Sequence, residues 1–355
     1  MCYRNRIEVI IDYMDQTIVT WLLTLVCAPH LIKNPYLTAK LVEVLFVISP
    51  SIQQTTMKIY NMVMNHELAQ SGLIPALMKF YVDIESTGQS TEFYDKFTIR
   101  YHISHIFKSM WNSPLHRQMM IVESKNGLQF VKFINMLIND TTFLLDECLE
   151  NLKKIHDVQS LMMNDEEWAK LDAEDQQSRQ RQLAQDERQC RSYLTLAKET
   201  VDMFHYLTTD IKEPFLRKEL VDRLSQMLNY NIKQLCGPKC SNLKVRNPAR
   251  YGWEPRRLLG QIVDIYVHLS CDEFAAALAR DERSFDKHFF EEAASRIEKN
   301  GIRSAIDVEK FRSLLQKASE IYTQNQNDDD DYADAPDEFK DPLVRIFNLK
   351  KSNYS

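Results

Sequence analysis

Glycine is scarce in this chain, with only 7 glycines among 355 residues, against roughly 7% in average proteins. Glycine supplies the positive-φ positions that hairpins, β-bulges and phosphate-binding loops need. The scarcity therefore argues against β-rich folds and against doubly wound nucleotide-binding folds. The hydrophobic fraction of 44% is large enough for a sizeable core. Together these features favour an all-helical protein.

The sequence also lacks a long apolar run. Its most apolar stretch, residues 18–28, is far shorter than the roughly 20 residues needed to span a bilayer. The net charge of −6 offers no general attraction to nucleic acid or to an anionic membrane. The cysteines are odd in number and scattered, which is typical of free thiols in a reducing compartment, the cytosol or the nucleus. They occupy positions 2, 27, 148, 190, 236, 240 and 271.

Helical periodicity recurs along most of the chain. Asn34 offers a side-chain cap and Pro35 follows at the first helical position. An apolar stripe through Leu37, Leu41, Val44, Leu45 and Ile48 continues this helix, which Pro50 ends. A longer stripe over 130–155 predicts a rod of about seven turns. Further stripes predict helices over 194–207, 220–235, 258–269, 289–297 and 308–322. We expect an irregular helical solenoid, with a closed helical bundle as the alternative.

Two polar segments interrupt this pattern. Residues 162–191 contain eight acids and five basic residues with few apolar anchors, which predicts either a solvated helix or a mobile connection. Residues 324–333 are polar and acidic and have nothing to bury, so they predict a linker and a domain boundary.

The cysteines at 236 and 240 could form half of a zinc site, because two thiolates close in sequence can chelate a metal. A structural zinc site needs four ligands, and only His205 and Cys271 are remote candidates. We therefore interpret the pair as part of a helix terminus. No metal or cofactor is expected.

No catalytic motif emerges elsewhere. His102 and His105 could share one helix face, but no HExxH spacing accompanies them. Residues 86–90 lack the second glycine and the Gly-Lys pair of a phosphate loop, and they predict a tight connection between helices. The aspartates at 328–331 lack the spacing and glycine of a calcium loop. The residues themselves therefore predict no catalytic constellation.

Several stretches resemble a known family, the U-box ubiquitin chain-elongation factors, also called ubiquitin conjugation factors of the E-four class. The resemblance is strongest to the B-type branch of animals. It rests on NPYLTAKLVEVL at 34–45, FYVDIESTG at 80–88, FYDKF at 93–97, INMLINDTTFLLDE at 134–147, QLAQDER at 182–188, LCGPKC at 235–240 and DAPDEF at 334–339.

The resemblance implies an armadillo-like helical core over residues 1–323, followed by the start of a U-box. The onset of the U-box would lie at residues 334–343, where the partner-docking surface would be incomplete, and residues 344–355 depart from the family. The matching onset residues are Asp334, Pro336, Glu338, Phe339, Asp341, Pro342 and Leu343. On this basis we expect a scaffold that lacks ligase activity of its own.

The family is a ubiquitin transferase that acts without a covalent intermediate and extends chains for proteasomal degradation, including ER-associated degradation. The resemblance implies three partners: a ubiquitin-conjugating enzyme, ubiquitin and a hexameric AAA segregase. It implies neither nucleic-acid binding nor membrane insertion. The alternative is a non-enzymatic armadillo-type adaptor that binds an extended peptide.

A third possibility is that the core is too incomplete to fold, and it concerns the N-terminal end of the solenoid. A severed stack exposes a face that would otherwise pack on the preceding repeat. We expect partial exposure of Ile7, Val9, Ile10, Ile11, Ile18, Val19, Leu22 and Leu23.

Overall fold

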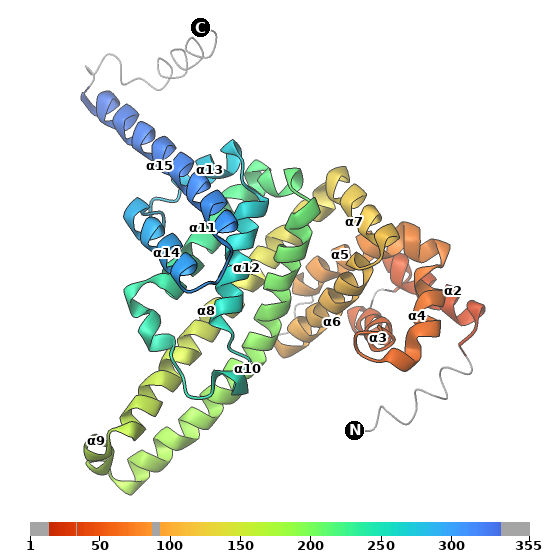
Figure 1. Cartoon of the computed structure of the whole chain (residues 1–355). Coiled ribbons are helices and arrows are strands. Elements are labelled where there is room, and N and C mark those ends of the chain that lie inside the picture. Colours follow the sequence, from red (N-terminus) through yellow and green to blue (C-terminus); the bar gives the residue numbers. More distant parts are fainter. Residues whose placement is uncertain (1–13, 33, 87–92, 335–355) are drawn as a thin grey trace.

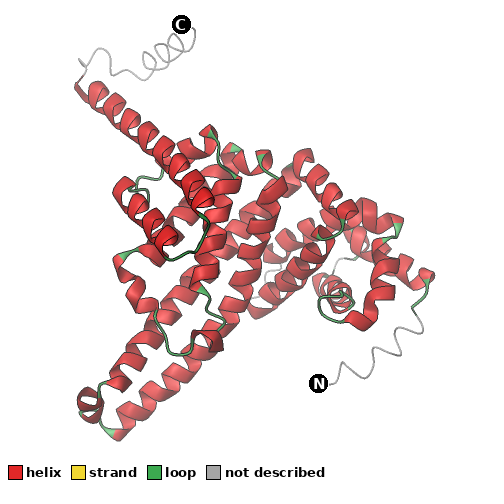
Figure 2. Cartoon of the chain, in the orientation of Figure 1, coloured by secondary structure: helices red, strands yellow, loops and turns green. Residues whose placement is uncertain are grey.

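The computed structural model describes residues 14–32, 34–86 and 93–334 of the chain. Helices account for most of these residues, and no strand occurs among them (Figure 2). The predicted all-α class is therefore confirmed.

The helices form three groups along the sequence. The N-terminal group contains α2 (Gln16–Cys27), α3 (Pro35–Val47), α4 (Met57–Met64), α5 (Ile74–Asp83), α6 (Phe93–Trp111) and α7 (Pro114–Asn126). The central group contains α8 (Leu128–Met163), α9 (Asp165–Ala169) and α10 (Ala173–Asp210). The C-terminal group contains α11 (Lys218–Cys236), α12 (Pro255–His268), α13 (Asp272–Ala279), α14 (Lys287–Lys299) and α15 (Ala305–Asp334).

Helices α8 and α10 form the spine of the molecule. They contain 36 and 38 residues, so each is about 55 Å long. They pack against each other, and α9 joins them at the end of a hairpin that projects from the body (Figure 1). The N-terminal helices cover one side of this spine and the C-terminal helices the other (Figure 1). The rod predicted over 130–155 is thus the buried part of α8.

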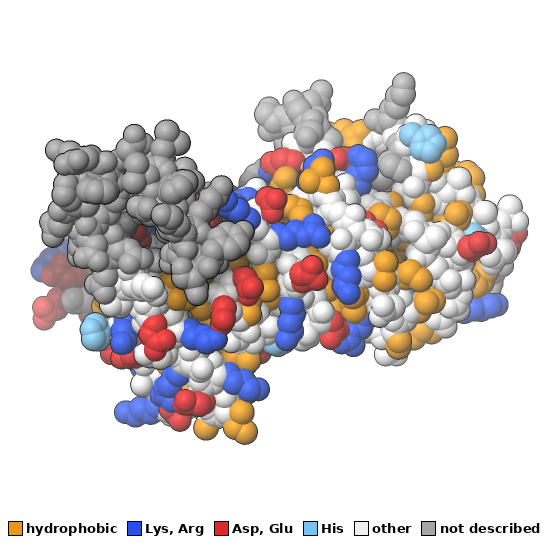
Figure 3. Space-filling view, turned by 90° about the horizontal axis from the view of Figure 1, so that it is seen from above, with side chains coloured by type: hydrophobic (Ala, Val, Ile, Leu, Met, Phe, Trp, Pro, Cys, Tyr) orange, Lys and Arg blue, Asp and Glu red, His pale blue; other side chains and the backbone are white. Residues whose placement is uncertain are grey.

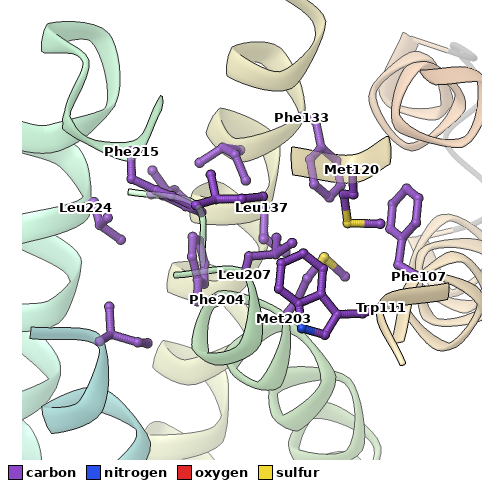
Figure 4. Packing of buried hydrophobic residues seen from close by; sticks show 14 of the residues in the cluster. Phe107, Trp111, Met120, Phe133, Leu137, Met203, Phe204, Leu207, Phe215 and Leu224 are labelled. Carbon is purple, nitrogen blue, oxygen red and sulfur yellow. The ribbon is translucent and has the colours of Figure 1, made fainter. Parts of the chain in front are cut away.

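Helices two or three places apart in the chain pack on one another, as in a solenoid. Helix α5 packs on α8, α10 on α12, α11 on α13 and α13 on α15. A large apolar core runs through these contacts from α2 to α15. Figure 4 shows its centre, where side chains of α6, α7, α8, α10 and α11 meet. These contacts support the irregular solenoid rather than a closed bundle.

The predicted helix start at Asn34 is confirmed, because its side chain accepts a hydrogen bond from the backbone N–H of Tyr36 at 2.9 Å. The predicted apolar stripe of this helix is only partly buried. Leu41 and Leu45 are in the core, whereas Leu37 and Val44 are exposed. The buried face is displaced because Thr38 and Val42 also point inward.

The charged segment 162–191 is expected to be either a solvated helix or a mobile connection, and the structure shows it as largely helical. Helix α10 begins at Ala173, capped by Asp172, and its first buried residue is Asp186. The predicted linker residues 324–333 have helical backbone as the last turns of α15, and the domain boundary there stays a prediction. None of the helices within the described ranges is both long and apolar enough to cross a bilayer.

Candidate functional site

The cysteine pair lies at the end of α11, as predicted. Cys236 is the last residue of the helix, and the N–H of Gly237 still bonds the carbonyl of Lys233 before Pro238 begins a 3-10 turn. Burial raises the pKa of the Cys236 thiol to about 11. The part of the chain that the structure describes contains no group of three or more His, Cys, Asp or Glu residues placed to hold a metal ion.

The two remote metal candidates have other partners. His205 Nε2 lies 2.8 Å from Asp264 Oδ2, and Arg303 also binds this carboxylate through two nitrogens. Cys271 caps α13 by accepting the N–H of Phe274 at 3.4 Å.

His102 and His105 hold α3 against α6. The ring of His102 stacks on Phe46 of α3 with centroids 4.2 Å apart, and His105 meets the same Phe46 ring edge-on at 5.5 Å. Burial lowers the pKa of both imidazoles. Both histidines therefore serve packing.

One arrangement superficially resembles a hydroxyl nucleophile beside a histidine. Thr208 Oγ1 lies 2.9 Å from His268 Nδ1, and the His268 ring lies 5.5 Å from that of His205. Thr208 is fully buried, however, and its hydroxyl donates to the carbonyl of Phe204 within α10 at 2.8 Å. A substrate has no access to this oxygen, so the pair cannot serve nucleophilic catalysis.

The most buried ionic group joins α5, α6 and α8. Arg100 donates to Asp140 Oδ1 at 2.8 Å, to the carbonyl of Tyr81 at 3.1 Å and to Glu85 at 2.9 Å. The Tyr81 hydroxyl donates to the other Asp140 oxygen at 2.7 Å. Burial raises the pKa of Asp140 to about 6, although the Arg100 charge opposes this. The hydrogen-bond partners in this ionic group are all other residues of the protein.

A second ionic group joins α6, α10 and α12 at Asp202. Lys108 donates to this carboxylate at 2.8 Å and Gln261 at 2.6 Å, and Arg257 lies 3.2 Å away. Burial alone would raise the pKa of Asp202, but the bonds from Lys108 and Gln261 and the nearby positive charges hold it below its ordinary value.

The space beside these groups is small. A cavity next to Arg100 and Asp140 measures about 10 Å³, and one lined by Trp253, Arg257 and Gln261 about 30 Å³. The larger holds about one water molecule. The two ionic groups therefore fix helix positions and offer no room for a substrate. Sequence spacing did not indicate either group, because their members are far apart in the chain.

The exposed apolar residues instead point to interaction surfaces. On the N-terminal helices, Trp21 is 57% exposed, and Ile18, Tyr36, Leu37 and Val44 are also exposed; we call these five residues the α2–α3 surface. On α7, Leu115, Met119 and Val122 recur at helical spacing and are exposed, and Leu128, the first residue of α8, follows at 69% exposure; we call these four residues the α7 stripe. Hydrophobic side chains are accordingly numerous over the N-terminal half of the molecule in Figure 3.

The expected exposure at the N-terminal end was partly wrong. Val19, Leu22 and Leu23 are buried in the core, and of the predicted residues within α2 only Ile18 is exposed. Trp21 takes the solvent-facing position instead. The remaining four, Ile7, Val9, Ile10 and Ile11, lie outside the described residues.

The predicted U-box onset also lies largely outside the described residues. Asp334 is the last residue of α15. Pro336, Glu338, Phe339, Asp341, Pro342 and Leu343 and the predicted tail 344–355 lie outside them. The connection at 87–90 does so as well.

Comparison with known proteins gives consistent matches. The family model described as "Ubiquitin elongating factor core" matches residues 1–319. The chain is 42% identical over 316 residues to the ubiquitin conjugation factor E4 of Schizosaccharomyces pombe, covering 88% of this chain and 31% of that protein. It is 38% identical over 322 residues to the E4 ubiquitin-protein ligase UFD2 of Saccharomyces cerevisiae, covering 89% and 34%. It is 35% identical over 319 residues to the ubiquitin conjugation factor E4 ufd-2 of Caenorhabditis elegans, covering 89% and 31%. The chain thus spans about a third of the length of these relatives.

Proposed function

This chain belongs to the ubiquitin elongating factor core family, and from that membership we propose that it acts in the extension of ubiquitin chains on protein substrates. The observation that carries the proposal is the match of the family model to residues 1–319. The names of the relatives, which describe ubiquitin conjugation factors and a ubiquitin-protein ligase, support it.

Within that reaction the helical core is a scaffold. Its described polar clusters are satisfied by other parts of the fold, and the cavities beside them have no space for a substrate. The thiols of Cys148, Cys190 and Cys236 are buried, and burial raises the pKa of each. A thiolate is the nucleophilic form of cysteine, so these residues are poorly suited to carry ubiquitin as a thioester. The scaffold contributes by holding reactants in position, which accelerates a reaction without covalent participation.

The partners are those that the family resemblance implies. A ubiquitin-conjugating enzyme would carry the activated ubiquitin, and an acceptor ubiquitin would supply the attacking lysine. A hexameric AAA segregase would connect the reaction to proteasomal degradation, including ER-associated degradation. The exposed apolar residues of the α2–α3 surface and the α7 stripe are suited to protein contacts of this kind.

A cytosolic or nuclear location suits the same role. Six cysteines, Cys27, Cys148, Cys190, Cys236, Cys240 and Cys271, are free thiols. Proteins of oxidising compartments commonly pair their cysteines, so this usage favours a reducing compartment.

An armadillo-type adaptor is the second candidate, because the α7 stripe offers an exposed apolar helix face without requiring ubiquitin. A chimera distinguishes the two. Residues 1–319 would replace the matching segment of the S. pombe relative, and chain growth on a ubiquitinated substrate would be followed on gels. We expect the chimera to extend chains, because the segment belongs to the same core. A folded chimera that extends none, beside an active parent protein, would contradict the proposed function.

A further inference from the structure

The segment that runs from the end of α11 into the first turn of α12 is strongly basic in an acidic protein. Residues 238–257, which we call the basic loop, contain six cations and one carboxylate, whereas the chain has a net charge of −6. The carboxylate is Glu254. The cations are Lys239, Lys244, Arg246, Arg250, Arg256 and Arg257. All six are exposed. In Figure 1 this segment runs beside the α8–α10 hairpin.

The basic loop is held in a defined conformation and contains 3-10 turns at Pro238–Leu243 and Pro248–Arg250. Leu243, Tyr251 and Trp253 are buried and anchor it in the apolar cluster between α8 and α10. Asn247 has a left-handed backbone with φ of 51°, and Gly252 has φ of 75°. Asn247 therefore adopts a backbone conformation that most residues avoid. The turn that follows it is closed by a hydrogen bond of 3.0 Å from the N–H of Trp253 to the carbonyl of Pro248.

Polar side chains of the α8–α10 hairpin hold the basic loop through hydrogen bonds. Gln159 of α8 accepts the backbone N–H of Arg246 at 2.7 Å and donates to the Tyr251 hydroxyl at 3.1 Å. That hydroxyl donates to Glu187 of α10 at 2.6 Å. His156 of α8 donates to the carbonyl of Lys244 at 2.5 Å. The backbone around Lys244 and Arg246 is therefore tied down while both side chains face solvent.

Three of the loop's cationic side chains have no partner among the described residues. Arg250 pairs with Glu187, Arg257 with Asp202 and Glu254, and Arg256 bonds the carbonyl of Asn300. Lys239, Lys244 and Arg246, by contrast, make no ion pair with any carboxylate of the described residues. An ordered loop that keeps exposed, unpaired positive charge has the electrostatic character of a binding surface.

We propose that the basic loop is a docking site for an acidic peptide segment of a partner protein. Charge complementarity selects the acidic partner. A nucleic acid is the weaker match, for two reasons. The negative net charge of the chain repels a long polyanion, and the aromatic side chains of the loop, Tyr251 and Trp253, are buried and give bases nothing to stack on. A short acidic segment needs only the local cations.

Fluorescence anisotropy on the full chain tests the proposal. The probe is a fluorescein-labelled peptide with six consecutive aspartates flanked by glycine and serine, at low ionic strength, where exposed charges interact most strongly. The peptide with asparagine at the six positions is the reference. We expect saturable binding of the aspartate peptide, weakening as salt is added, and none of the asparagine peptide. Failure of the chain to bind the aspartate peptide would overturn the proposal.

Two triple variants distinguish the effect of the loop's charges on binding from the effect of the chain's total charge. K239E/K244E/R246E reverses the three unpaired cations, and K132E/K218E/K310E reverses three exposed lysines elsewhere, so both change the net charge equally. We expect the loop variant to bind about tenfold or more weakly and the control to stay within about twofold of the original chain. Equal weakening would mean that total charge governs binding and would overturn the docking site.

A third variant tests whether the loop must be held in place. Gln159→Ala removes the bonds to Arg246 and Tyr251 without changing any charge. We expect a loss of several-fold in affinity for the aspartate peptide at unchanged helical content by circular dichroism. A more mobile loop loses more conformational entropy when it binds the peptide. Unchanged affinity would overturn the preorganised site.

Tighter binding of an oligothymidine that displaces the peptide would overturn the choice of partner.

Discussion

Arg100 and Asp140 form a buried ion pair in which the guanidinium nitrogen Nη1 lies 2.8 Å from the carboxylate oxygen Oδ1. The Arg100 side chain is 3% exposed and that of Asp140 6%. Forty residues separate them, and their contact locks α6 to α8. Because a buried charge is costly unless it is paired, the pair makes the register of these two helices specific.

The first prediction concerns this pair. Arg100→Ala should lower the free energy of unfolding by about 3–5 kcal/mol, because it leaves the Asp140 carboxylate buried without its cation. Denaturant unfolding followed by circular dichroism measures the change. The control is Lys170→Ala, which removes an exposed pair with Glu167 and should cost less than about 0.5 kcal/mol. Similar losses from both variants would contradict the importance of burial.

The second prediction is a pH dependence. Burial raises the pKa of Asp140 to about 6 from the ordinary 3.8, so the folded state binds this proton more tightly than the unfolded state. Its contribution to stability is therefore fully present below about pH 4 and is lost as the pH rises through about 6. Relative to Asp140→Asn, the original chain should lose roughly 2–3 kcal/mol over that interval. A difference between the two proteins that stays constant with pH, or grows, would contradict this assignment.

The third prediction compares two adjacent methionines of α7. Met119 belongs to the exposed α7 stripe, whereas Met120 is 1% exposed and lies in the core. Met120→Ala should cost about 2–5 kcal/mol of unfolding free energy, and Met119→Ala should change it by less than about 0.5 kcal/mol. Thermal and denaturant unfolding check both values. If Met119→Ala proved as damaging, the stripe would be packed against other residues and could not serve as a free surface.

The fourth prediction concerns the α2–α3 surface. Trp21 is 57% exposed, whereas Trp111 and Trp253 are buried. Acrylamide should therefore quench a fraction of the tryptophan fluorescence readily, and Trp21→Phe should reduce that fraction. Trp253→Phe is the matched control and should leave it intact. Equal quenching of the original chain and the Trp21 variant would place Trp21 in a covered position.

Local signals predicted much of the fold. The cap at Asn34, the rod within α8 and the end of α11 at Gly237 depend on neighbouring residues and are visible in the sequence. The burial of α2 was harder to predict, because Ile18 and Trp21 on one side are as apolar as Val19 and Leu22 on the other. Periodicity cannot choose between two apolar faces; only the tertiary contacts do.

The functional surfaces depend on long-range contacts, so they are harder to predict from the sequence. The six cations of the basic loop could be counted in the sequence, but their arrangement depends on Gln159 and Glu187, about 60 to 90 residues earlier in the chain. Likewise, no local spacing links Arg100 to Asp140 or Lys108 to Asp202. The residues predicted for the U-box onset, Pro336 to Leu343, lie outside the described residues, and their role stays a prediction.

The central claim is that the helical core positions ubiquitin-transfer reactants without forming a bond to ubiquitin itself. The most direct test mixes residues 1–355 with a conjugating enzyme charged with labelled ubiquitin and resolves the products on gels with and without reducing agent. We predict no ubiquitin adduct of the chain that a reducing agent removes, because the core acts by positioning and burial raises the pKa of five of its six described thiols. A reducible adduct that disappears when one cysteine of the chain is replaced by serine would contradict the account.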